Sequence, residues 1–134
     1  MPRWRKPTAD AVYTPDKITV RQADELPKWT FAEGWIRRKY KASGWKGTLM
    51  VVNTVDHLAE AAWHHPALTV SYAFVTVKLM NHTAEGITDK YFELARKIEA
   101  VVRWRPGSEE GTALEGTPDD PRFKYLKYDW SGAC

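Results

Sequence analysis

Three histidines are the side chains in this sequence best suited to chemistry. His64 and His65 are adjacent, and His82 follows further along the chain. Histidine titrates near neutral pH, so it can both give and take a proton. Glu60 precedes His64 by one helical turn, which lets the two side chains meet on a helix. Adjacent histidines are poor joint ligands for zinc, and their spacing differs from that of zinc sites, so we expect no metal. Two interpretations of the three histidines stay open: they transfer protons, or they lie on the surface without a role.

Composition limits the class of protein that carries these histidines. The chain has 134 residues, a net charge of +3 and one cysteine, Cys134. That length predicts one domain, and a lone cysteine excludes a disulfide framework or a cysteine zinc site. The basic start lacks an apolar signal region, and no apolar run is long enough to span a membrane. We therefore expect a cytoplasmic protein that binds neither membrane nor nucleic acid.

Two strands and a long helix are predicted ahead of the histidine pair. Residues 18–26 can hold one short helical turn before Pro27. Residues 29–32 and 35–41 predict strands joined at Glu33-Gly34, a two-residue hairpin link. Positive charges fall on both faces of 35–41, so neither face is cleanly apolar, which favours an edge strand. Residues 46–62 predict a helix that ends before Pro66. Its predicted apolar stripe consists of Leu49, Val52, Val55, Ala59 and Ala62.

A strand region and a second helix follow the pair. Residues 68–81 are rich in β-branched and aromatic side chains, which predicts one long strand or two joined near Ala73. Residues 91–104 predict a helix with Thr88 as its N-cap and Asp89 in its first turn. The predicted stripe of this helix is Tyr91, Leu94, Ala95, Ile98, Val101 and Val102.

The order of these elements predicts an α+β fold. Helix, two strands, helix, two strands and helix fit a four-stranded antiparallel sheet with helices on one face. We expect an arm over 1–17, a domain over 18–104 and an extension over 105–134. The extension is acidic and then aromatic, with Phe123, Tyr125, Tyr128 and Trp130 near its end. Such a segment is either disordered or docked on the body or on a partner, and both alternatives stay open.

The histidine spacing resembles a known signature. The pattern of the pterin-4a-carbinolamine dehydratase family is an acid, three residues, His-His-Pro, a short gap, an aromatic residue, nine residues and a histidine. The matching residues here are Glu60, His64, His65, Pro66, Tyr72 and His82. Gly86-Ile-Thr88 and Phe92-Glu-Leu94-Ala95 resemble the last helix of the family. The resemblance covers about residues 26–102, so it leaves out the arm and the extension.

The resemblance implies a hydro-lyase of the 4a-hydroxytetrahydrobiopterin dehydratase type. Its substrate would be a 4a-hydroxytetrahydropterin, which loses water to give the quinonoid dihydropterin. Family members are homodimers or homotetramers that use no metal and no redox cofactor. The reaction gives a proton to the leaving hydroxyl and takes one from N5, which suits two groups that titrate near neutrality.

The resemblance also implies a role for each residue of the signature. His64 and His82 would be the acid–base pair, in unassigned order. His65 would orient the pterin, and Glu60 would hold His64 or meet the edge of the pterin. Trp63 would be either a pocket wall or part of the core, while Pro66 and Tyr72 complete the predicted substrate site.

One position departs from the family pattern and supports an alternative function. The family has an aspartate where Tyr91 stands here, and Asp89 lies two residues earlier. With Thr88 as N-cap, Tyr91 is at N3, where an acid would complete a capping box, so the aspartate fits helix capping better than catalysis. Some relatives are non-catalytic assembly factors, including ones for Rubisco. Tyr91 and an extension rich in interface-type aromatic residues agree with such a protein partner.

Overall fold

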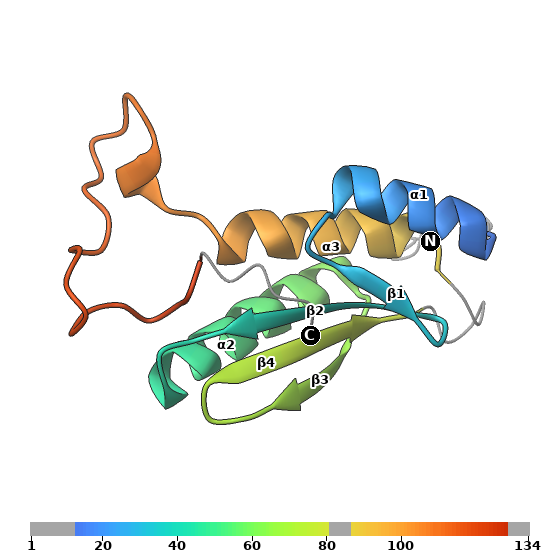
Figure 1. Cartoon of the computed structure of the whole chain (residues 1–134), viewed down its shortest axis with the longest axis horizontal. Helices are drawn as coiled ribbons and strands as arrows, with labels where there is room; N and C mark the ends of the chain where they lie inside the picture. Colours follow the sequence, from blue (N-terminus) through green and yellow to red (C-terminus); the bar gives the residue numbers. More distant parts are fainter. Residues whose placement is uncertain (1–12, 81–86, 129–134) are drawn as a thin grey trace, which may run out of the picture.

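Three α-helices and four strands alternate along the chain in the predicted order. The computed structural model describes residues 13–80 and 87–128 (Figure 1). The elements are α1 (Pro15–Glu25), β1 (Thr30–Ala32), β2 (Trp35–Lys41), α2 (Trp45–Ala62), β3 (Ala67–Val70), β4 (Phe74–Leu79) and α3 (Asp89–Val102), followed by a 3-10 turn at Pro106–Ser108. The α+β class and the antiparallel sheet are therefore confirmed.

The sheet has the order β1-β2-β4-β3, which makes β2 a central strand. The prediction of an edge strand at 35–41 was therefore wrong. On β2, Ile36, Arg38 and Tyr40 are buried, and they lie opposite Leu79, Val77 and Val75 of β4. Charge on β2 does not mark an edge, because Arg38 is buried together with an acidic partner on α3.

Two hairpins link neighbouring strands of the sheet. The first turns at Glu33 and Gly34, whose φ angles are +54° and +82°, as the two-residue link predicted. The second resolves the alternatives for residues 68–80 in favour of two strands, β3 and β4, which pair antiparallel. Residue 81 lies outside the described part of the chain.

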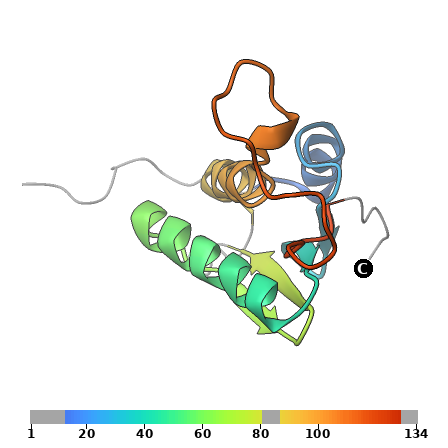
Figure 2. The ribbon, with the colours of Figure 1, turned by 90° about the vertical axis from the view of Figure 1, so that its left-hand side faces the viewer.

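The helices cover one face of the sheet, and α2 and α3 lie side by side on it (Figures 1 and 2). Helix α2 begins one residue earlier than predicted, but its buried face is rotated from the predicted stripe. The buried residues of α2 are Gly47, Thr48, Val51, Val55 and Ala59. Leu49 is 37% exposed and Ala62 is exposed. The prediction misplaced the stripe because Gly47 and Thr48 are not apolar residue types. In the structure these two residues are buried and make close contacts with the rest of the fold.

Helix α1 is longer than the single turn predicted for residues 18–26. It begins at Pro15 after the N-cap Thr14, whose hydroxyl accepts a hydrogen bond from the Lys17 amide at 3.3 Å. Arg21 binds Asp89 at the start of α3, so α1 is fastened to α3. Hydrogen bonds from Arg21 and Tyr13 hold the pKa of the Asp89 carboxyl below its usual value.

Helix α3 begins at its predicted N-cap, Thr88, but the threonine side chain makes no capping hydrogen bond. Its hydroxyl is instead buried, without a hydrogen-bond partner among the described residues. Phe92 belongs to the buried face and was missed, whereas Val101 was predicted to be buried and is 40% exposed.

The carboxylate of Glu99 ties α3 to the sheet. It accepts hydrogen bonds from Trp29 Nε1 at 3.0 Å, Arg38 Nε at 3.0 Å and the Tyr40 hydroxyl at 2.7 Å. Arg103, in the turn after Glu99, adds an ion pair at 3.4 Å. The donors come from β2, from the residue before β1 and from the end of α3, so one side chain fixes the relative position of these segments.

The described part of the extension, residues 105–128, docks on the body, which agrees with one of the two alternatives that the sequence left open. Leu126 is buried and pairs with Ala42 in an isolated β-bridge, and the Tyr125 carbonyl accepts a hydrogen bond from the Ser43 amide at 3.0 Å. That carbonyl lies 2.0 Å from where a Cβ on Gly47 would be, so only glycine admits the extension there. Trp130 lies outside the described residues.

Removing the Glu99 carboxylate will destabilise the fold. In Glu99→Ala, Arg38 stays buried without its acidic partner, a change that costs about 3 kcal/mol of unfolding free energy. Urea unfolding measures this difference. The matched control is Glu93→Ala, an exposed acid on the same helix, which we expect to change stability by less than about 0.5 kcal/mol. Equal losses in the two variants would contradict the role given to Glu99.

Glu99 also predicts part of the acid sensitivity of the fold. Burial alone raises the pKa of this carboxyl, but hydrogen bonds from Arg38 and Tyr40 outweigh that effect and leave the pKa below its usual value. A lowered folded-state pKa stabilises the protein above the unfolded pKa, about 4.3, and the gain is lost as pH falls through the folded pKa. Stability measured between about pH 5 and pH 2 should fall less steeply in Glu99→Gln than in the wild type. An unchanged slope would contradict this.

Candidate functional site

The histidine pair follows the end of α2 directly, as predicted. Trp63 ends the helix in a left-handed conformation, with φ +59° and ψ +40°, and its amide donates to the carbonyls of Ala59 and Glu60. The His64 amide donates to the Ala59 carbonyl at 3.1 Å. A bulky side chain in this region of backbone space is uncommon, and such strain gathers at functional positions. The turn sends His64 and His65 in different directions before β3 begins.

His65 pairs with Glu60, for which the sequence left open a contact with His64 or with the edge of the pterin. Its Nε2 lies 2.8 Å from Glu60 Oε1, and both side chains are more than half exposed. The helix does not continue to residue 64, so the spacing of one helical turn between Glu60 and His64 does not apply. The indole of Trp63 stands edge-on to the His65 ring, with centroids 5.1 Å apart, and is 48% exposed. Trp63 is therefore not part of the core.

His64 packs against α3 through Tyr91. The two ring centroids lie 5.1 Å apart at an interplanar angle of 64°, an edge-to-face contact. Tyr91 is 4% exposed and His64 is half-buried, so the imidazole has one shielded side. The sequence placed Tyr91 in the predicted stripe of this helix and as a departure from the family's aspartate. It did not predict the contact with His64.

The other predicted site residues are placed differently. Pro66 is half-buried and follows His65 directly. Tyr72 lies in the β3–β4 turn, 68% exposed, with its hydroxyl 3.3 Å from the Cβ position of Gly44, the N-cap of α2. The 18 residues of α2 span about 27 Å, so within one chain Tyr72 and His64 sit at opposite ends of this helix. His82 lies outside the described residues.

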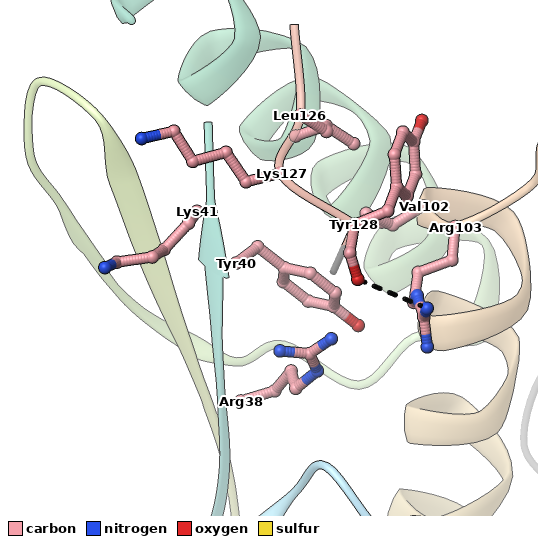
Figure 3. Close-up of a pocket in the computed structure, with 8 residues that line it drawn as sticks. All are labelled: Arg38, Tyr40, Lys41, Val102, Arg103, Leu126, Lys127 and Tyr128. Carbon is pink, nitrogen blue, oxygen red and sulfur yellow. Dashed lines mark hydrogen bonds between the residues drawn. The ribbon is translucent and has the colours of Figure 1, made fainter. Parts of the chain in front are cut away.

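Two hollows lie at the far end of α3 from Tyr91. A cavity of about 10 Å³ is enclosed by Arg38, Tyr40, Arg103, Tyr128 and their neighbours, and Figure 3 shows the Tyr128 carbonyl accepting a bond from Arg103 there. That volume holds one water and no pterin. A larger groove lies beside Trp104 in the extension. Within residues 13–80 and 87–128, no cluster of acids, histidines or cysteines could hold a metal ion.

Comparison with known proteins decides the family. The sequence profile of pterin 4 alpha carbinolamine dehydratase matches residues 11–101. The chain belongs to this family. It is 42% identical over 83 residues to a protein of Aquifex aeolicus that is provisionally named a pterin-4-alpha-carbinolamine dehydratase, covering 62% of this chain and 84% of that one. A protein of Acidobacterium capsulatum with the same provisional name is 36% identical over 92 residues, which are 69% of this chain and 99% of the relative.

A solved structure shares the fold of this family member. The crystal structure of a transcriptional coactivator/pterin dehydratase from Brucella melitensis superposes with a TM-score of 0.63 at 22% identity, covering 69% of this chain and 99% of that one. The family match ends at residue 101, so the extension lies outside it. None of the helices in the described residues is long and apolar enough to cross a membrane.

The contact between Tyr91 and His64 can be tested without an activity assay. In Tyr91→Leu the imidazole proton signals of His64 should shift, because an aromatic ring 5.1 Å away is removed. Tyr91→Phe keeps the ring and should leave those signals near their wild-type positions. NMR of the full chain measures both. The His65 signals serve as an internal control, since the His65 ring contacts Glu60 and Trp63. Unchanged His64 signals in the leucine variant would contradict the contact.

Proposed function

We propose that the protein dehydrates a 4a-hydroxytetrahydropterin to the quinonoid dihydropterin. In this reaction one group protonates the 4a-hydroxyl, the C4a–O bond breaks with loss of water, and a second group removes the N5 proton as the new C=N bond forms. His64 and His82 fill these two roles in our proposal. Family membership supports the reaction class, and the role of His82 rests on the sequence signature alone.

The observation that carries the proposal is that His64 and His65, at the end of α2, have different surroundings. His64 is half-buried against Tyr91, which suits a group that must keep one orientation while it exchanges a proton. His65 is more exposed and holds the Glu60 carboxylate. That pair presents both a donor and an acceptor to solvent, which suits hydrogen bonding to the polar edge of a pterin. His65 and Glu60 are thus substrate-binding groups, with Trp63 as an aromatic wall beside them.

A second candidate function is that of a non-catalytic assembly factor, such as one for Rubisco. The observation that favours it is the extension, which lies beyond the family match and leaves Trp104, Leu114 and Phe123 about half exposed. Exposed aromatic and aliphatic side chains of this kind serve as anchors in protein interfaces. Three expectations stay predictions: that the chain forms homodimers or homotetramers, that it is cytoplasmic, and that Tyr72 belongs to the site.

A dehydration assay separates the two functions. We expect the wild type to accelerate loss of water from a 4a-hydroxytetrahydropterin, and His64→Ala and His82→Ala each to lose about 10²-fold or more in kcat, the usual contribution of a general acid or base. The matched control is His57→Ala, an exposed histidine on α2, which should keep the wild-type rate. A wild-type rate equal to the uncatalysed background would reject the enzyme and favour the assembly factor.

A further inference from the structure

The extension lies beyond the C-terminal end of α3 (Figure 1). It forms a groove of about 590 Å³. Its apolar lining includes Trp104, Pro106, Leu114 and Tyr125. Trp104 is 53% and Leu114 54% exposed, so both present large apolar surfaces to solvent. This volume is in the range of sites that bind small molecules or single bulky side chains. The groove lies outside the family match, so it is no part of the proposed pterin site.

Two close contacts of the backbone give the groove its shape. A Cβ on Gly107 would lie 2.6 Å from the Glu115 carbonyl oxygen, and one on Gly116 would lie 2.9 Å from the Gly107 amide nitrogen. The start and the end of the loop therefore cross at van der Waals contact, as in a compact Ω-loop. The crossing sets Leu114 and Glu115 across from Trp104. At its other side the extension is fixed to the body by Leu126.

The loop that forms the groove gives it an acidic rim. Glu115 lines the groove, and Glu109 and Glu110 lie on the same loop. All three are exposed, and none of them has an ion pair with another described residue. Residues 107–121 contain no lysine or arginine. The nearby guanidinium of Arg105 lies over the Tyr128 ring, 4.5 Å from its centroid. An apolar groove with such a rim fits a basic segment that carries one bulky apolar side chain.

We propose that the groove binds the N-terminal segment of the same chain, residues 1–12, with Trp4 as the anchor. This segment holds Arg3, Arg5 and Lys6 around Trp4, and its only acid is Asp10. Tryptophan and arginine are the residues most enriched at the energetic centres of interfaces. Charge complementarity with the acidic rim and the apolar match of the indole with Trp104 and Leu114 both favour this occupant.

The segment is long enough to reach the groove within one chain. The Tyr13 amide donates to the Ile87 carbonyl at 2.9 Å, which fixes the end of the segment near the start of α3. The other end of this 14-residue helix is about 21 Å away, and the groove begins just past it, at Trp104. The nine residues from Trp4 to Tyr13 extend to about 30 Å.

A spin label tests this placement in the full chain. A nitroxide on Thr8→Cys, in a Cys134→Ser background, should broaden the Leu114 methyl and Trp104 indole signals and leave the Val70 methyl signal on β3 unchanged. Adding Trp4→Ala should restore the Leu114 and Trp104 intensities, as should high salt, which screens the charges. The matched control is Val12→Ala, which removes apolar atoms of the segment but keeps Trp4 and the cations. It should leave the broadening in place.

Two results would overturn the proposal. One is full intensity of the Leu114 and Trp104 signals in the labelled chain, or broadening that Trp4→Ala does not change. The other is broadening that appears only between chains, in a mixture of spin-labelled chains and isotope-labelled chains without nitroxide, since that would assign the groove to a second copy. The dehydratase assay plays no part in this test, so its outcome is independent of the proposed catalytic function.

Discussion

The position of α3 on the sheet depends on one partly buried carboxylate. Glu99 brings together side chains from the residue before β1, from β2 and from the turn after α3, and it neutralises the otherwise buried charge of Arg38. An unpaired arginine in that position would cost several kcal/mol, so this pairing strongly restricts where α3 can lie. The apolar core alone could accept small shifts of the helix, whereas a set of directed hydrogen bonds to one carboxylate does not.

This constraint reaches the candidate site through the length of α3. Glu99 fixes the helix near its C-terminal end, the Arg21–Asp89 ion pair fixes its start, and Tyr91 is thereby held against His64. The end of α2 supplies the second half of the site, because Trp63 turns the chain so that Glu60 meets His65. The histidine pair is thus part of a link between two anchored helices. A rigid scaffold with its reactive groups at element ends is the usual arrangement of catalytic sites.

The sequence predicted the fold class and the position of the histidine pair, because both depend on local signals. These signals are the spacing of apolar residues, the turn residues and the prolines. It did not predict the burial of Arg38, although Arg38 shares its face of β2 with Ile36 and Tyr40, because its acidic partner is 61 residues away. It did not predict the contact of Glu60 with His65, because a tryptophan with left-handed backbone at a helix end has no sequence pattern of its own. The contact of Tyr91 with His64 depends on how two helices pack, and the spacing within one helix does not contain that information.

We propose a pterin site at the end of α2, built on His64 and His65. The most direct measurement is an NMR titration of the full chain, labelled at histidine, with a stable dihydropterin. Such a site predicts saturable shifts of the His64 and His65 imidazole signals, while the signals of His57, the exposed histidine within α2, stay in place. No saturable shift at either residue, or equal shifts at all the histidines, would contradict a pterin site at this position.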